Sequence, residues 1–237
     1  MTQKIWLAAD YHFPITYSCR MPLSSPHNSQ CLPAPGPATV KLALIRNSIE
    51  LFGLAQARDI LFPVIRDSKV MISPPAQVAI SIHTLRSYKA SEKKGQTNLV
   101  ESIGYREFAH TYDILTIFFL VPVIMKEHFI ELFNVVGYWG QASSLAFCQR
   151  VYEEKPTRQE TVQPLSSLVD MALGTRFTAF MTEWQKDNVT WDIVTGLKSA
   201  KFLESMLYVF PLEVCEWHGL EHLLVSCLLE VNINLSD

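Results

Sequence analysis

The pattern of apolar and polar residues predicts a strand and two helices at the start of the chain. Residues 5–13 are apolar and rich in aromatic side chains and end at Pro14, which is typical of a strand in the core of a sheet. From Pro37, apolar residues recur at spacings of three and four as far as Gly53. We therefore expect an amphipathic helix that begins at a proline and stops before a glycine. A second short helix is expected over residues 55–62.

The segment between the first strand and the first helix is rich in proline. Six prolines lie from Pro14 to Pro37, together with several Ser and Asn residues. This composition excludes a regular helix or a central strand and favours an extended loop that contacts a partner.

The middle of the chain predicts a projecting hairpin at about residues 78–112. An edge strand is expected to begin after the Pro74-Pro75 pair and to run to about Lys89, where the turn-forming residues 91–98 interrupt it. Residues 100–110 and 113–125 then supply returning strands. The apolar run 114–125 has 12 residues and contains Pro122. It is too short for a membrane span, which needs roughly 20 apolar residues.

The remaining pattern completes an α+β fold. We expect a helix over residues 126–136, a strand over 146–151, a surface loop over 153–163 and strands over 189–194 and 207–209. Residues 220–229 fit either a helix or a strand. This order of elements predicts a ferredoxin-like (RRM-like) antiparallel sheet, with helices on one face and the hairpin as a thumb. Residues 1–140 form that domain. Residues 141–237 are a β-rich portion, either part of the same compact unit or a degenerate second ferredoxin-like unit.

Composition narrows the class of protein. The chain of 237 residues has 20 Lys and Arg against 23 Asp and Glu, so its net charge of −3 lacks the positive excess of a free nucleic-acid binder, and any RNA contact must be local. Five widely spaced cysteines do not form the dense, even framework of a disulfide-stapled fold. The N-terminus has no apolar secretion signal, so we expect a cytoplasmic protein.

Three passages resemble a known family. Arg20 to Pro26 is a Ser- and Pro-rich loop after the first strand, and Cys31 to Leu44 is an entry of prolines and small residues into the first helix. Ile82 to Lys89 and Ile103 to Phe108 are two strands separated by a polar turn. Together they resemble the CRISPR-associated protein family numbered five, a branch of the RAMP superfamily. The resemblance covers about residues 1–135. The glycine-rich loop common near the C-terminus of RAMP proteins is missing.

This resemblance implies a subunit of a type I Cascade complex. Such a subunit grips the 5′ handle of the CRISPR guide RNA (crRNA) beside the large subunit and the first backbone subunit. It meets target DNA only indirectly and needs no cofactor. Residues 83–106 carry five Lys or Arg and two Glu, a local net charge of +3. Single-stranded RNA is held by such cations together with aromatic faces. The candidate RNA-binding residues are Arg20, Ser24, Ser25, His27, Lys41, Arg46, His83, Arg86, Tyr88, Lys89, Lys93, Lys94, Tyr105 and Arg106.

Other interpretations stay open. The hairpin fits an ordinary solvated hairpin, and the chain fits a protein-interaction domain without an RNA role. Some members of the family cut precursor RNA without a metal, and Lys4, Tyr11 and His12 have suitable chemistry. Adjacent residues of a strand point to opposite faces, however, so we expect no catalytic residues here.

Four Cys and His residues near the C-terminus form a candidate metal site. Cys215, His218, His222 and Cys227 have a spacing compatible with zinc, and 215, 218 and 222 would share one face of a helix. Apolar residues fill the interval, so we expect packing rather than metal binding.

Overall fold

The computed structural model describes residues 3–25, 28–90, 99–168, 175–185, 188–199, 201–218 and 221–227, without the side chains of residues 87, 89, 90, 100, 217 and 218. The first of its main sheets is antiparallel, with the order β5-β8-β1-β9. Its strands are β1 (Lys4–His12), β5 (Val70–Ser73), β8 (Leu115–Pro122) and β9 (Phe147–Glu153). All residues from Leu7 to Tyr11 are buried because β1 lies between two neighbours.

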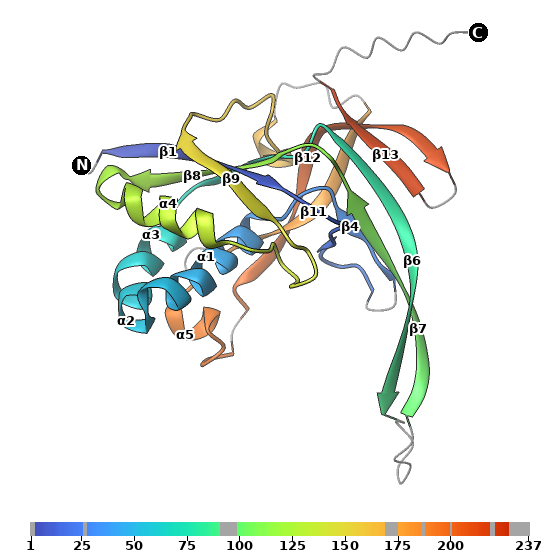
Figure 1. Ribbon diagram of the computed structural model, residues 1–237, viewed down its shortest axis with the longest axis horizontal. Helices are drawn as coiled ribbons and strands as arrows, with labels where there is room; N and C mark the ends of the chain where they lie inside the picture. The colour runs from blue at the N-terminus through green and yellow to red at the C-terminus, as the bar shows by residue number, and fades with distance from the viewer. Residues whose placement is uncertain are drawn as a thin grey trace.

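A layer of helices lies against one face of this sheet (Figure 1). It consists of α1 (Pro37–Phe52), α2 (Leu54–Gln56), the π-helical turn η1 (Ala57–Leu61), α3 (Phe62–Asp67), the 3₁₀ turn η2 (Val123–Met125) and α4 (Lys126–Val135). The prediction of the first helix from Pro37 to Gly53 is confirmed. Pro37 lies in its first turn, and Gly53 ends it with a φ of 81°, in the left-handed region that glycine adopts without strain.

The larger sheet joins the hairpin to the C-terminal strands. Its order is β10-β12-β13-β6-β7-β3, and β11 pairs with β12 outside this path. The strands are β3 (Asn28–Ser29), β6 (Gln77–Ala90), β7 (Leu99–His110), β10 (Gln163–Pro164), β11 (Arg176–Trp184), β12 (Leu203–His218) and β13 (Glu221–Ser226). The short strands β2 (Cys19–Arg20) and β4 (Cys31–Leu32) pair with each other. The 3₁₀ turn η3 (Leu165–Ser167) and the helix α5 (Trp191–Val194) complete the chain's described elements.

Two predicted elements differ from the structure, and one open alternative is decided. The strand β6 is not an edge strand at its base, because Gln77 to Ile80 pair with β13. Residues 189–194 contain α5 instead of a strand, since Trp191 packs edge-to-face on Phe62 with 5.6 Å between ring centroids. Residues 221–226 are a strand, which decides the question left open for 220–229.

The two halves of the chain share one hydrophobic core. Leu7, Phe119 and Phe133 belong to the same buried cluster as Trp184 and Phe210. The strand β9 follows residue 140 in sequence and still pairs with β1, so the first sheet extends beyond the predicted boundary. The α+β class with antiparallel sheets is confirmed. Within the described part of the chain, no helix is both long and apolar enough to cross a membrane.

Candidate nucleic-acid interface

The hairpin of β6 and β7 projects away from the body of the molecule (Figure 1). Its twelve paired positions run from Ala79 opposite His110 to Ala90 opposite Leu99. Near its base, Ile80 and Ala109 are buried in the core, whereas Tyr88 is 70% exposed towards the tip. The predicted projecting hairpin is therefore present.

The register divides the candidate residues between the two faces of the hairpin, because opposite residues of an antiparallel pair share a face. One face, here called the aromatic face, is the outward continuation of the core side. It carries Thr84, Arg86, Tyr88, Leu99, Glu101, Ile103 and Tyr105. Its large side chains are exposed, including Tyr105 at 50% and Ile103 at 51%. His83 and Arg106 lie opposite each other on the second face.

The two hairpin cations whose side chains the structure describes, Arg86 and Arg106, each have one neighbouring polar side chain. Arg86 lies 3.7 Å from Glu101, and both side chains are exposed. A surface ion pair of this kind contributes about 0–1 kcal/mol, so a phosphate can replace the carboxylate. Arg106 donates a hydrogen bond of 3.1 Å to the Gln141 side-chain oxygen. The His83 ring packs edge-to-face on Phe108 and exchanges a 3.0 Å hydrogen bond with the Ser81 hydroxyl.

The proline-rich loop lies directly beside the base of the hairpin. The strand β3 pairs with β7 in parallel, placing Asn28 opposite Tyr105 and Ser29 opposite Arg106. Most of the loop is packed into the molecule: Tyr17, Cys31 and Leu32 are at most 2% exposed. Among the described residues of the loop, the exposed ones lie at 14–16, 28 and 30 and in the bend of residues 20–25, and the predicted contact with a partner stays a prediction for these positions.

Arg20, Ser24 and Ser25 shape this bend. Arg20 donates from Nη2 to the Ser24 carbonyl oxygen at 2.8 Å, and the Ser24 hydroxyl donates to the Met21 carbonyl oxygen at 2.7 Å. The Ser25 hydroxyl accepts the Asn28 N–H at 3.0 Å. The guanidinium of Arg20 stays exposed at the surface next to the hairpin base.

Glu107, which is not among the residues predicted from the sequence, connects the loop to the hairpin. Its carboxylate is buried and accepts the N–H of Cys31 at 2.8 Å, while its carbonyl oxygen accepts the Ser18 hydroxyl at 3.0 Å. Tyr17 and Ala109 exchange two backbone hydrogen bonds of 2.9 and 2.7 Å in the same region. These contacts fix the loop to the hairpin and therefore position both parts of the interface.

Two of the candidate cations lie away from this interface. Lys41 is 3% exposed, donates to the Arg66 carbonyl oxygen at 3.2 Å and lies 3.8 Å from the Glu183 carboxylate. It does not present a free ammonium at the start of α1, as the sequence had suggested. Arg46 stacks on the Tyr138 ring at 3.7 Å and lies 3.9 Å from Glu50. Neither residue joins the hairpin.

The other candidates lie outside the described residues. His27, Lys93 and Lys94 fall in undescribed segments, and Lys89 is described by its backbone alone. Their roles stay predictions of the sequence.

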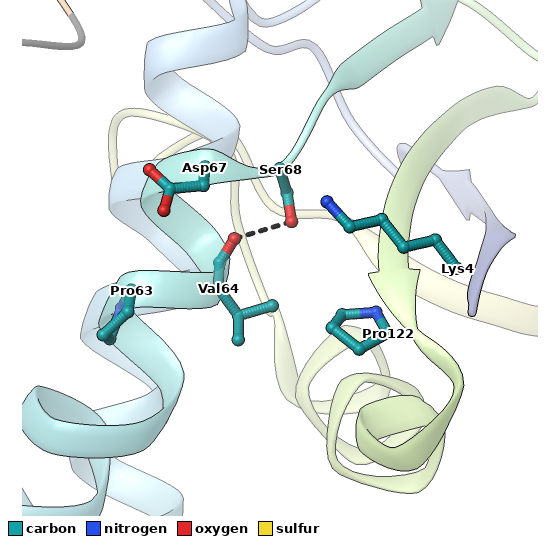
Figure 2. Close-up of a pocket in the computed structure, with 6 residues that line it drawn as sticks. All are labelled: Lys4, Pro63, Val64, Asp67, Ser68 and Pro122. Carbon is teal, nitrogen blue, oxygen red and sulfur yellow. Dashed lines mark hydrogen bonds between the residues drawn. The ribbon is translucent and has the colours of Figure 1, made fainter. Parts of the chain in front are cut away.

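The three residues considered for RNA cleavage do not converge. Tyr11 and His12 are consecutive residues of β1, and the Tyr11 hydroxyl donates to the Phe133 carbonyl oxygen at 2.6 Å. Burial raises the pKa of Tyr11 well above its usual value. Lys4 lines a pocket of about 220 Å³. Figure 2 shows it there together with residues of α3 and Pro122. Lys4 and Tyr11 stand at opposite ends of the strand.

Three of the four candidate zinc residues lie on two strands, and Cys227 lies in the turn that follows β13. Cys215 is on β12 and His222 on β13, so the helical face assumed for positions 215, 218 and 222 does not exist. Burial lowers the pKa of His222. Among the residues that the structure describes, no three His, Cys, Asp or Glu side chains come together to hold a metal ion.

Comparison with known proteins gives one curated relative. The chain is 28% identical over 156 residues to the CRISPR-associated protein Cas5 of Archaeoglobus fulgidus. The matched region covers 64% of this chain and 67% of that protein. No family model matches. The predicted resemblance to CRISPR-associated protein family five is confirmed by this relative, while membership of a type I Cascade stays a prediction.

Two solved structures are similar in outline. One is the crystal structure of a CRISPR protein from Archaeoglobus fulgidus, with 10% identity over 94% of this chain and 92% of that chain and a TM-score of 0.46. The other is a chain of the cryo-EM structure of the Type III-B Cmr-beta bound to cognate target RNA. It has 8% identity over 65% of this chain and 61% of that chain, with a TM-score of 0.49.

Proposed function

We propose, because the chain is a relative of CRISPR-associated protein Cas5, that it is a subunit of an RNA-guided surveillance complex of the Cascade type. In this proposal it binds the 5′ handle of the crRNA between the β6–β7 hairpin and the bend of residues 20–25. The main support for the proposal is the parallel pairing of β3 with β7, because it brings two segments that are distant in sequence into one surface.

The order of the first sheet supports a ferredoxin-like unit as the base of this surface. In the order β5-β8-β1-β9, β1 connects to β5 through helices, and β8 connects to β9 through α4. Two such crossovers on one face of an antiparallel sheet are the ferredoxin-like arrangement. The hairpin is an insertion between β5 and β8, so it can project without disturbing that unit.

The chemistry of the hairpin supports RNA as its ligand. Tyr88 and Tyr105 offer exposed rings on the same face as Arg86. A base that stacks on such a ring is stabilised by about 1–3 kcal/mol, and the neighbouring cation can contact its phosphate. Arg106 lies within the β3–β7 pairing, opposite Ser29, and Arg20 lies in the exposed bend that precedes β3, so both can contact further phosphates.

We propose a non-catalytic role within the complex. The buried hydroxyl of Tyr11 argues against its acting as an acid or base with His12 and Lys4. The backbone subunits and the large subunit are the proposed protein partners, target DNA is met through them, and the proposed location is the cytoplasm. Exposed Ile103 and Leu99 give the hairpin apolar area for a protein contact.

Charge reversal on the hairpin tests this proposal. We expect the double variant Arg86→Glu and Arg106→Glu to weaken binding of a repeat-derived RNA by about tenfold or more, because it replaces two phosphate contacts with repulsion. Fluorescence anisotropy at one fixed salt concentration measures the affinity. The matched control is Lys155→Glu with Lys201→Glu, which makes the same charge change at exposed positions outside the hairpin.

Unchanged affinity of the hairpin variant would favour the alternative, a protein-interaction domain without an RNA role. Site-specific cutting of the same RNA by the unmodified chain in EDTA would contradict the non-catalytic part of the proposal.

A further inference from the structure

The first sheet has an open face on the side away from α1 and α4. Those helices pack on the opposite face, where Leu7 belongs to the main core (Figure 1). On the open face, a second and smaller apolar cluster contains Ala8 and Phe118, and Tyr152 packs against it. The face is formed by β1, β5, β8 and β9, so it includes neither the β6–β7 hairpin nor the bend of residues 20–25. The proposed function therefore gives it no role.

Asp10 places a buried carboxylate on this open face, since it alternates along β1 with Ala8. Its side chain is 5% exposed. The carboxylate accepts hydrogen bonds from the Thr116 hydroxyl at 2.7 Å, from Arg150 Nε at 2.7 Å and from the Tyr152 hydroxyl at 3.3 Å. Burial, followed by the charge of Asp10, raises the pKa of Tyr152 to about 12, so this hydroxyl keeps the proton that it donates. Three donors compensate for the burial of the carboxylate, and the same bonds hold Arg150 and Tyr152 in place.

Arg150 is open to a ligand in spite of its ion pair. Its side chain is 69% exposed, and the hydrogen bond to Asp10 uses Nε. The guanidinium carbon lies 4.7 Å from the centroid of the Tyr152 ring. Because a planar guanidinium carries five N–H donors, the bond to Asp10 leaves Nη donors for a phosphate. Asp10 and Tyr152 fix the orientation of the guanidinium before a ligand binds, which lowers the entropic cost of binding.

A β-bulge brings Phe147 to the same face. The register of β9 on β1 shifts between Asp10 and Tyr11, which makes Gln149 an extra residue of β9. Without that residue, alternation would turn Phe147 towards the helices. With it, Phe147 lies opposite His12 on the open face and is 59% exposed. Bulges often re-aim a side chain beside a functional site, so the exposed ring is a second contact for a ligand.

We propose that this open face binds single-stranded nucleic acid at a site separate from the hairpin. A base stacks on Phe147, and the Nη donors of Arg150 bind a phosphate of the same strand. These two side chains stand in neighbouring rows of the face, opposite His12 and Asp10, and such rows are about 7 Å apart. A nucleotide supplies both complements, a flat ring and an anion. Stacking accepts every base, so the site binds without sequence preference.

Fluorescence anisotropy with a labelled oligouridine of about ten nucleotides, which lacks the handle sequence, tests the proposal. Every chain in this experiment also carries Arg86→Glu and Arg106→Glu, so that these hairpin cations contribute no phosphate contact. We expect Phe147→Ala to weaken oligouridine binding about fivefold or more, because a stacked base is lost. Arg150→Lys should weaken it too, since it keeps the charge beside Asp10 but loses the planar guanidinium.

Phe180→Ala is the matched control for the stacking residue. Phe180 is an aromatic residue of β11 in the larger sheet and is also exposed, at 40%. Its replacement should leave oligouridine affinity unchanged. Thermal unfolding midpoints are measured for each variant, and we expect no change for Phe147→Ala because that side chain is exposed.

Equal affinities of the Phe147→Ala and Phe180→Ala variants would overturn the proposal and favour a protein partner for this face. The absence of oligouridine binding at about 100 µM chain and low salt would overturn it as well. Either failure is distinct from failure of the proposed RNA role, which is measured with handle RNA on the unmodified hairpin. A repeat with the unmodified chain loaded with handle RNA identifies the source of the ligand. If oligouridine still binds and Phe147→Ala still weakens it, the face takes a separate strand; if the loaded chain no longer binds it, the handle RNA itself continues over the face.

Discussion

Glu107 joins the two parts of the proposed interface through a single buried carboxylate. It accepts the Cys31 N–H at 2.8 Å from the interior side of β7. We predict that Glu107→Ala lowers the free energy of unfolding by about 1–3 kcal/mol, because the buried N–H loses its partner. Urea denaturation measures this change. RNA affinity should fall as well, since one of the contacts that fix the loop to the hairpin is lost.

Glu101→Ala is the matched control for that prediction. Glu101 lies on the same strand but is exposed, and its contact with Arg86 is a surface ion pair. Its removal should change stability by less than about 1 kcal/mol. A similar loss of stability in both variants would contradict the role given to Glu107.

The sequence predicts the orientation of some side chains and not of others, as Glu107 and Lys41 show. Alternation along β7 places Tyr105, Glu107 and Ala109 on one face. Because Ala109 is buried, the sequence pattern is sufficient to predict that the Glu107 carboxylate points inward. The burial of the Lys41 side chain could not be predicted from the sequence. Its burial depends on Glu183, which is 142 positions away in sequence and approaches only through the folding of β11 against α1.

At the scale of elements, the β2–β4 loop should make stability sensitive to high pH. Burial raises the pKa of the Cys31 thiol to about 12 and raises the pKa values of Cys19 and Tyr17. The unfolded chain releases the thiol protons at about pH 8.5, while the native chain retains them. Stability is therefore fully present below that pH and decreases as pH rises towards 12, by up to about 1.4 kcal/mol per pH unit for each thiol.

Urea denaturation between pH 7 and pH 10 measures this dependence. Cys31→Ala should make the decrease shallower, because one buried thiol no longer contributes. Cys215→Ala should leave it unchanged, since Cys215 is exposed. A stability that stays constant up to pH 10 in the unmodified chain would contradict the account of this loop.

Local signals predicted some elements well and others poorly. The bounds of α1 follow from a proline and a glycine, which act on the backbone itself. The hairpin follows from alternation on both sides of a polar turn. By contrast, residues 189–194 are rich in β-branched side chains and still include the helix α5, because packing of Trp191 on Phe62 outweighs a weak strand preference. The burial of the proline-rich loop likewise depends on partners that are distant in sequence.

At the scale of the whole molecule, charge and shape are distributed unevenly. A chain with net charge −3 concentrates cations in residues 83–106, and this segment includes the part that leaves the body of the protein. The sheets on either side share one core, so the body is a firm support for the hairpin. Such an arrangement allows a local RNA contact without a basic protein as a whole.

A chain with a shortened hairpin tests the central claim most directly. Thr84 and Tyr105 are opposite each other in the register, so residues 85–104 can be replaced by Asn-Gly, which favours a two-residue turn. Binding is measured with an RNA that carries the repeat-derived 5′ handle and with the same RNA lacking it. We predict that the full chain prefers the handle and that the shortened chain, with an unchanged thermal unfolding midpoint, loses about tenfold or more in affinity for it. A folded, shortened chain that binds the handle RNA as tightly as the full chain would contradict the account.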